Sequence, residues 1–239
     1  MGMLNSSAGL SSCRKRVSVV TGSSGYLGRE VVHSLLQSFI PVEETLSTHP
    51  SSEILCLVRQ RRVEEEEQYW RDVCTNLGPS CSGRVKVMPY DMLDGGKTLS
   101  DALHYAFAMD KEKIKSDSSI SPNRNGSGGD DDSECCIYHI ASVFSKTEDH
   151  RRMALENVKG AVDLIETVAK FPISRSNVVF TSSMAAVRGP GQIPGNSKWY
   201  THEDWNSVSE LGSNWASSYQ WSKAESEKVS FVILAYSFI

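Results

Sequence analysis

Val17-Ser-Val-Val-Thr21 runs directly into Gly22-Ser-Ser-Gly-Tyr-Leu-Gly28, and this stretch decides the fold. The first five residues are mostly β-branched, as in a buried parallel strand. The glycines then let the chain turn sharply, and apolar residues follow at helical spacing at Val31, Val32, Leu35, Leu36 and Phe39. A strand, a glycine-rich turn and a helix in this order predict the first unit of a parallel α/β sheet.

The same alternation continues along the chain. Apolar runs at 53–58, 84–88, 136–140 and 177–180 predict further strands, and helical spacing between them is clearest at 155–169. We therefore expect an α/β fold, a Rossmann-type doubly wound parallel sheet with helices on both faces. The run Glu64 to Glu67 is expected to be a solvated helix face.

Three regions define the predicted domain organisation. Residues 1–15 are expected to be a flexible N-terminus, and 16–239 are expected to form one Rossmann domain. Within it, 111–134 is rich in Ser, Gly and Asp, a composition that predicts a disordered surface insertion.

Composition narrows the class of protein. The 239 residues are 39% hydrophobic and 23% charged, and the formal net charge is −4, so no basic surface for nucleic acid is expected. The six cysteines show no spacing typical of zinc ligands, and no metal site is predicted. We see no signal peptide, and the apolar stretch 229–239 is too short for a membrane helix. The prediction is a cytoplasmic protein without a membrane partner.

The glycine turn predicts a nucleotide cofactor. Gly22, Ser24, Gly25 and Gly28 lie where the backbone of such a turn approaches a pyrophosphate at a helix N-terminus. The spacing differs from the G-x-G-x-x-G of most dehydrogenases. A glycine-rich turn without a ligand is the alternative, and we favour cofactor binding.

Residues after the second and third expected strands refine the choice of cofactor. Arg59 ends the second strand, where arginine attracts a ribose 2′-phosphate and an acidic residue would repel it. NADP(H) is therefore preferred over NAD(H), although Arg59 could instead pair with Glu64 or Glu65. Asp91 and Met92 follow the third strand, where an adenine contact would fall, although aspartate is also common in turns.

Three residues predict carbonyl chemistry. In Tyr219-Gln-Trp-Ser-Lys223 the lysine lies one helical turn after the tyrosine and on the same face. Its positive charge would stabilise the phenolate and lower a pKa that is near 10 in free tyrosine. Ser183 follows the fifth expected strand, where its hydroxyl could hydrogen-bond a substrate carbonyl oxygen. His139 and Asn157 are expected to be structural, whereas Ala141 and Ser142 should face the cofactor.

The chain resembles the extended short-chain dehydrogenase/reductase family, within the NAD-dependent epimerase/dehydratase superfamily. VTGSSGYLG at 20–28, IYHIAS at 137–142, VVFTSSMAAV at 178–187 and SSYQWSKAESEK at 217–228 are most similar to dihydroflavonol-reductase-like and cinnamoyl-CoA-reductase-like enzymes. The resemblance implies NADPH-dependent reduction of a ketone, aldehyde or thioester by Ser183, Tyr219 and Lys223. It also implies cofactor contacts at Tyr26, Leu27, Arg59, Asp91 and the turn Ile140-Ala141-Ser142.

The end of the chain departs from that family. Its members continue after the tyrosine helix into a sixth strand and a substrate-binding region, whereas this sequence ends with VSFVILAYSFI. We therefore expect a truncated reductase with an exposed sheet edge and marginal stability. Two alternatives stay open: a nucleotide-sugar epimerase or dehydratase, and a catalytically incompetent cofactor-binding or interaction protein. Trp199, Trp205 and Trp215 either line a substrate pocket or anchor the 188–216 loop.

Overall fold

A computed structural model describes residues 16–38, 52–116, 134–146, 148–171, 176–195 and 198–236. The predicted flexible N-terminus at 1–15 lies outside the described residues. So does most of the predicted insertion, since only 117–133 separate the two described segments there.

Five parallel strands form the predicted sheet, in the order β3-β2-β1-β4-β5. The strands are β1 (Arg16–Thr21), β2 (Glu53–Val58), β3 (Val85–Pro89), β4 (Glu134–His139) and β5 (Ser176–Phe180). Thr21 at the end of β1 lies beside Leu57 of β2 and His139 of β4, and His139 lies beside Phe180 of β5. The carboxyl ends of the four strands are therefore level, and the reversal of order between β1 and β4 creates the crevice where doubly wound folds bind ligands.

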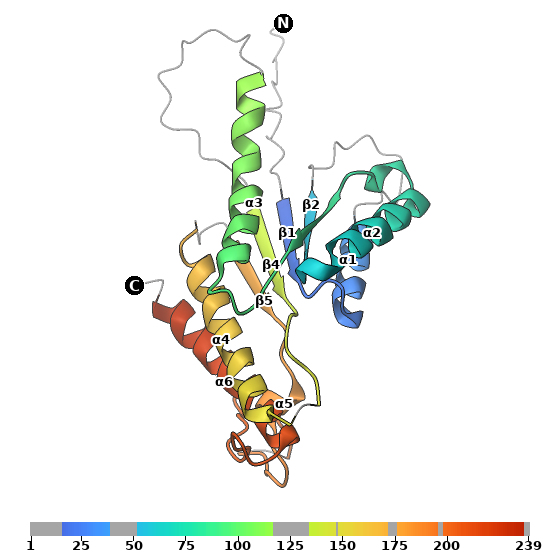
Figure 1. The fold of residues 1–239 in the computed structure, drawn as a ribbon. Helices are drawn as coiled ribbons and strands as arrows, with labels where there is room; N and C mark the ends of the chain where they lie inside the picture. The colour runs from blue at the N-terminus through green and yellow to red at the C-terminus, as the bar shows by residue number, and fades with distance from the viewer. Residues whose placement is uncertain are drawn as a thin grey trace, which may run out of the picture.

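Helices cover both faces of the sheet (Figure 1). On one face lie α1 (Tyr26–Gln37) and α2 (Val63–Leu77), and on the other α3 (Lys97–Ser116) and α4 (His150–Val168). The helix α6 (Trp215–Tyr236) packs mainly against α4 and the short α5 (Met184–Val187). Two short 3₁₀ turns, η1 (Gln60–Arg62) and η2 (Pro79–Cys81), flank α2.

A separate apolar core fills each side of the sheet. On one side, Val32 and Leu36 of α1 and Trp70 of α2 pack against the sheet. On the other side, Leu103 of α3 and Leu164 and Ile165 of α4 do so. β1 and β2 are buried in all but their first residue, which is typical of the central strands of a parallel sheet. The predicted doubly wound architecture is confirmed.

The structure corrects two details of the sequence prediction. Helix α3 continues to Ser116, so the first part of the predicted insertion is helical. Glu66 is fully buried and is bound by two arginines, so the run Glu64 to Glu67 is not a uniformly solvated face. The sequence does not distinguish Glu66 from its three neighbouring glutamates, because Glu66 is buried only through the approach of α1.

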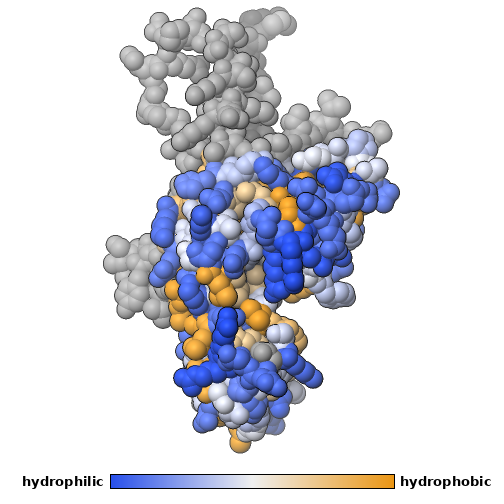
Figure 2. All heavy atoms as spheres, in the orientation of Figure 1, coloured by the Kyte–Doolittle hydropathy of each residue, from blue (hydrophilic) through white to orange (hydrophobic). Residues whose placement is uncertain are grey.

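β5 forms one edge of the sheet, and its residues alternate between half-buried and exposed. Val179 is 48% exposed, and apolar side chains also reach the surface at Phe144, Met184 and Phe231. Figure 2 shows apolar surface in the lower half of the view, where α4, α5 and α6 lie in Figure 1. Within the described residues, no helix is both long enough and apolar enough to cross a membrane.

Candidate active site at the carboxyl end of the sheet

The glycine turn between β1 and α1 is closely packed. Gly22 has a φ of +69°, and a Cβ built on it would lie 2.9 Å from the backbone of Ala141. A Cβ on Gly28 would lie 2.2 Å from the Gly22 carbonyl oxygen. Gly25 precedes α1, and no side chain caps this helix. The first N–H groups of α1 are thus left to backbone, solvent or a ligand, and the turn has the shape of a phosphate cradle.

Two other residues of the turn are exposed to solvent, although the sequence predicted that they contact a cofactor. Tyr26 is 89% and Leu27 47% exposed, which is unusual for large apolar side chains at the start of a helix. Ser24 is half-buried beside them. The structure thus brings the predicted turn residues together at the carboxyl end of β1.

A hydrogen-bond cluster joins this turn to the end of β4. The Thr21 hydroxyl oxygen accepts bonds from the backbone N–H groups of Ile140 and Ala141, at 3.1 and 3.2 Å. Because both of its lone pairs are used, its proton is donated to Nδ1 of His139, which lies 2.9 Å away. The His139 proton is therefore on Nε2. Burial and the nearby Lys223 charge lower the pKa of His139 to about 3, so the ring is neutral.

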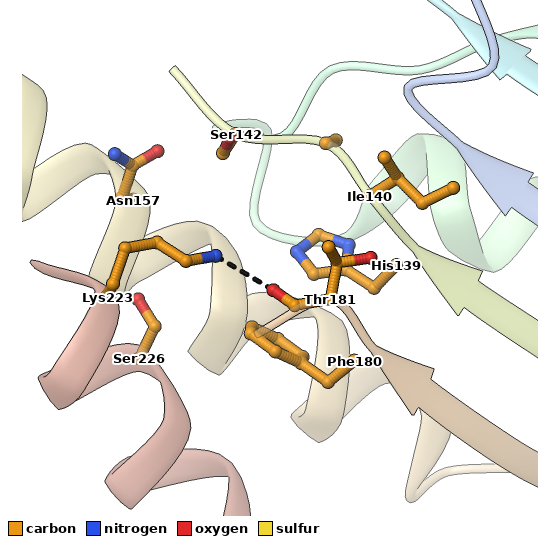
Figure 3. Close-up of a pocket in the computed structure, with 9 residues that line it drawn as sticks. His139, Ile140, Ser142, Asn157, Phe180, Thr181, Lys223 and Ser226 are labelled. Carbon is orange, nitrogen blue, oxygen red and sulfur yellow. Dashed lines mark hydrogen bonds between the residues drawn. The ribbon is translucent and has the colours of Figure 1, made fainter. Parts of the chain in front are cut away.

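A small pocket lies at this end of the sheet (Figure 3). Its lining comes from β4 and the following loop, from the end of β5, from α4 and from α6: His139, Ile140, Ala141, Ser142, Asn157, Phe180, Thr181, Lys223 and Ser226. The predicted cofactor turn at 140–142 and the predicted catalytic lysine thus line one pocket, although they are about 80 residues apart in the sequence.

Lys223 is buried and points across the pocket. Its Nζ donates a hydrogen bond to the carbonyl oxygen of Thr181, at 2.9 Å (Figure 3). Burial lowers the pKa of Lys223, and the charge of Glu227 partly opposes this shift. The lysine amino group is therefore held just after the end of β5, at the residue that precedes Ser182 and Ser183.

Ser183 and Tyr219 meet beside this pocket. Ser183 precedes α5, and its hydroxyl accepts a bond from the Ala185 N–H at 3.1 Å. Burial raises the pKa of Tyr219, and the nearby Ser183 side chain opposes this shift only in part. The sequence predicted a lowering by Lys223. In this arrangement the lysine lies on the Thr181 carbonyl and does not contribute to the Tyr219 pKa.

Two aromatic side chains hold the Tyr219 ring. Trp215 is parallel to it, with 5.9 Å between ring centroids, and Phe144 meets it edge-on at 4.8 Å. The indole N–H of Trp215 donates to the Ser145 carbonyl oxygen at 2.7 Å. Trp215 is thus an anchor beside the site, whereas Trp199 is 78% exposed. Phe144 was not predicted, because nothing in the sequence marks its loop as adjacent to α6.

Asn157 fixes the loop after β4. Its side-chain oxygen accepts from the Val143 N–H at 2.7 Å, and its amide donates to the Val143 carbonyl oxygen at 3.0 Å. The amide also lies 3.5 Å from the Ser222 hydroxyl on α6. The expected structural role is consistent with these contacts, and they also show that Asn157 supports the pocket-lining loop directly.

At the end of β2, Arg59 is exposed and precedes η1. Within the 59–62 segment, Arg62 is the arginine that pairs with the acidic run, because it binds Glu65 and Glu66. Asp91 is exposed, and its carboxylate accepts from the Leu93 N–H at 2.9 Å, which is ordinary turn chemistry. Met92 packs against Gly160 of α4 and joins the core. Arg59 thus has a side chain available to a ligand, whereas Met92 is partly used in packing.

Comparison with solved structures identifies the fold. Yeast methylglyoxal/isovaleraldehyde reductase Gre2 in complex with NADPH matches with a TM-score of 0.62 at 20% identity, over 93% of this chain and 54% of that one. Gre2 from Candida albicans in complex with NADPH matches with a TM-score of 0.64 at 18% identity, over 92% and 53%. This chain has the fold of these reductases.

The reductase fold agrees with the resemblance found in the sequence motifs. The chain spans about half the length of these solved structures, since it covers 54% and 53% of them. No protein-family model matches, and a search of curated proteins finds no match either. In the described part of the chain, no group of three or more His, Cys, Asp or Glu side chains is placed to hold a metal ion.

Proposed function

We propose that this chain is the cofactor-binding and catalytic core of an NADPH-dependent reductase acting on a ketone, aldehyde or thioester carbonyl. The observation that carries the proposal is the meeting of three elements at the carboxyl end of the sheet. The pocket is lined by the 140–142 loop and Lys223, and Ser183 and Tyr219, which lie close enough for Ser183 to influence the pKa of Tyr219, are beside it. Two hydroxyl groups at the same end of the sheet as a buried lysine suit protonation of a carbonyl oxygen.

Each of the three residues has a distinct role in this proposal. When bound, the cofactor would supply the hydride that reduces the carbonyl carbon. The Tyr219 hydroxyl gives its proton to the carbonyl oxygen, and the Ser183 hydroxyl donates a hydrogen bond to the same oxygen as negative charge develops there. The positive charge of Lys223 lowers the pKa of Tyr219 in the loaded protein, because it stabilises the phenolate that remains.

The shape of the glycine turn supports a dinucleotide. The contacts that a Cβ on Gly22 or Gly28 would make leave no room for a larger residue, so the backbone itself forms the surface of the cradle. Arg59, exposed at the end of β2, supports a preference for NADP(H) over NAD(H), because a guanidinium group binds the 2′-phosphate well. We assign cofactor contacts to the predicted turn residues, to Arg59 and Asp91, and to the 140–142 loop.

Thermal unfolding of the purified chain with NADPH and with NADH tests the cofactor proposal. Stabilisation by NADPH that exceeds stabilisation by NADH is the expected result. Stabilisation by NADH alone would instead favour the epimerase or dehydratase alternative. No shift with either cofactor would refute cofactor binding by this chain.

Single-turnover oxidation of bound NADPH by small aldehydes, ketones and thioesters tests the catalytic proposal. We expect Tyr219→Phe to slow this step by roughly 10²–10⁴-fold, the usual contribution of a general acid. Tyr105→Phe is the control, because Tyr105 hydrogen-bonds Glu53 at the opposite end of the sheet. Cofactor binding without any turnover would identify a binding protein that lacks catalytic competence.

A further inference from the structure

A buried carboxylate lies between α1 and α2. Glu66 has no solvent exposure, and its Oε1 accepts hydrogen bonds from Arg29 at 2.6 Å and from Arg62 at 3.0 Å. An unpaired carboxylate would be very unfavourable in this position, so the two guanidinium groups are what allow it to be buried. The three side chains therefore form one unit, which we call the Glu66 cluster.

The Glu66 cluster joins two segments that carry predicted cofactor contacts. Arg29 lies in the first turn of α1, directly after Gly28, and Arg62 is the last residue of η1. The guanidinium group of Arg29 also lies over the Tyr69 ring, 4.2 Å from its centroid. The hydrogen bond with Glu66 raises the pKa of Arg29, so this arginine stays charged. The cluster therefore fixes η1 to the helix that begins at the glycine turn.

The cluster includes only one of the three arginines in the 59–62 segment. Arg62 is bound by Glu65 and Glu66. Arg59 and Arg61 are exposed, and no ion pair involves either of them within the described part of the chain. One arginine is thus structural, whereas two keep a positive charge in solvent at the carboxyl end of β2.

We propose that Glu66 is a positioning residue for cofactor selection: by holding Arg62 against Arg29 it fixes the turn from which Arg59 and Arg61 bind a 2′-phosphate. This inference rests on the proposed function. A buried, doubly bonded carboxylate restricts the motion of η1, and a restricted turn loses less conformational freedom when it binds an anion. Glu66 acts only through the arginines, because it has no surface of its own to offer a ligand.

Glu66→Gln tests the proposal with little change of shape. The Gln oxygen can accept the same two hydrogen bonds, but the negative charge that holds both guanidinium groups is lost. The matched control is Glu64→Gln, which makes the same change of charge at an exposed position of the same helix. Dissociation constants for NADPH and for NADH are measured by calorimetry on the full chain, with thermal unfolding as the check that each variant is folded.

The two cofactors separate positioning from a general structural role. We expect Glu66→Gln to weaken NADPH binding about tenfold, comparable to the loss of one charge-assisted hydrogen bond, and NADH binding by less than about twofold. Glu64→Gln should change neither. Equal weakening of both cofactors would indicate a structural role and overturn the proposal. Tighter NADPH binding would also overturn it, because Glu66 would then compete with the phosphate for the arginines.

A double-mutant cycle keeps the test decisive. Arg62→Ala removes the link between Glu66 and η1 while the Arg29–Glu66 pair remains. If Glu66 acts through Arg62, the double variant should show the same NADPH-to-NADH ratio as either single variant. Additive losses would overturn the positioning role. If the unmodified chain binds neither cofactor, the proposed function fails and this inference with it, whereas an NADPH preference unchanged by Glu66→Gln refutes only the inference.

Discussion

Acidification should destabilise this protein through His139 before its carboxylates are protonated. The imidazole accepts a hydrogen bond from Thr21. Its burial and the nearby charge of Lys223 lower its pKa from 6.5 to about 3. The folded chain thus keeps His139 neutral, whereas the unfolded chain binds a proton as the pH falls through 6.5. The stability that His139 contributes is therefore fully present above pH 6.5 and is lost progressively as the pH falls towards the folded-state value.

The size of this effect follows from proton linkage. Between pH 7 and pH 5 the folded form binds almost no proton at His139, so the loss depends only on the unfolded-state pKa and amounts to about 2 kcal/mol. This value would be the same for any folded pKa below about 4. Ordinary carboxylate pKa values are near 4, below this window.

Urea denaturation at pH 7, 6 and 5 measures this loss. His139→Asn is the variant of choice, because an amide oxygen can accept the Thr21 hydrogen bond and does not titrate. It should be less stable at pH 7, but its free energy of unfolding should fall about 2 kcal/mol less between pH 7 and pH 5 than that of the unmodified chain. His202→Asn, at an exposed histidine, is the control. Parallel pH profiles for the unmodified chain and His139→Asn would refute the argument.

Three further substitutions test the packing around the site. Gly28→Ala should destabilise the chain by roughly 1–3 kcal/mol and abolish the NADPH-dependent shift in Tm, because the new Cβ would lie 2.2 Å from the Gly22 carbonyl oxygen. Asn157→Leu should cost about 2 kcal/mol in urea denaturation and speed hydrogen exchange at Val143, whose backbone loses both bonds to that side chain. Trp70→Ala should lower the free energy of unfolding by about 3–5 kcal/mol in the same assay, because Trp70 is only 1% exposed in the core between α2 and the sheet. A loss below 1 kcal/mol would mean that this side of the sheet is loosely packed.

The relation between Lys223 and Tyr219 shows how far a motif can be interpreted. Their spacing correctly places both residues on one helix, because i and i+4 share a face. It does not fix where the lysine amino group points. In the structure that group donates to the Thr181 carbonyl oxygen, and Ser183, not Lys223, influences the pKa of the tyrosine. The orientation of a long side chain depends on which acceptors the fold brings near it.

The sequence alone determined the order of strands and helices, the sharp turn at Gly22 to Gly28, and the set of segments expected at one end of the sheet. These features are local: they follow from hydrophobic periodicity and from the steric freedom of glycine. The regular handedness of parallel connections restricts which strand orders are possible, and the structure shows that β3-β2-β1-β4-β5 is the one that forms.

Only the tertiary structure decided which side chains within those segments are coupled. Glu66 is one of four consecutive glutamates, and its burial depends on the approach of Arg29 from α1. The neutral state of His139 depends on its burial and on the charge of Lys223 of α6, and its ring is oriented by Thr21, from a strand more than a hundred residues earlier. Burial and charge pairing depend on neighbours that are distant in the sequence, and no local pattern of residues specifies those neighbours.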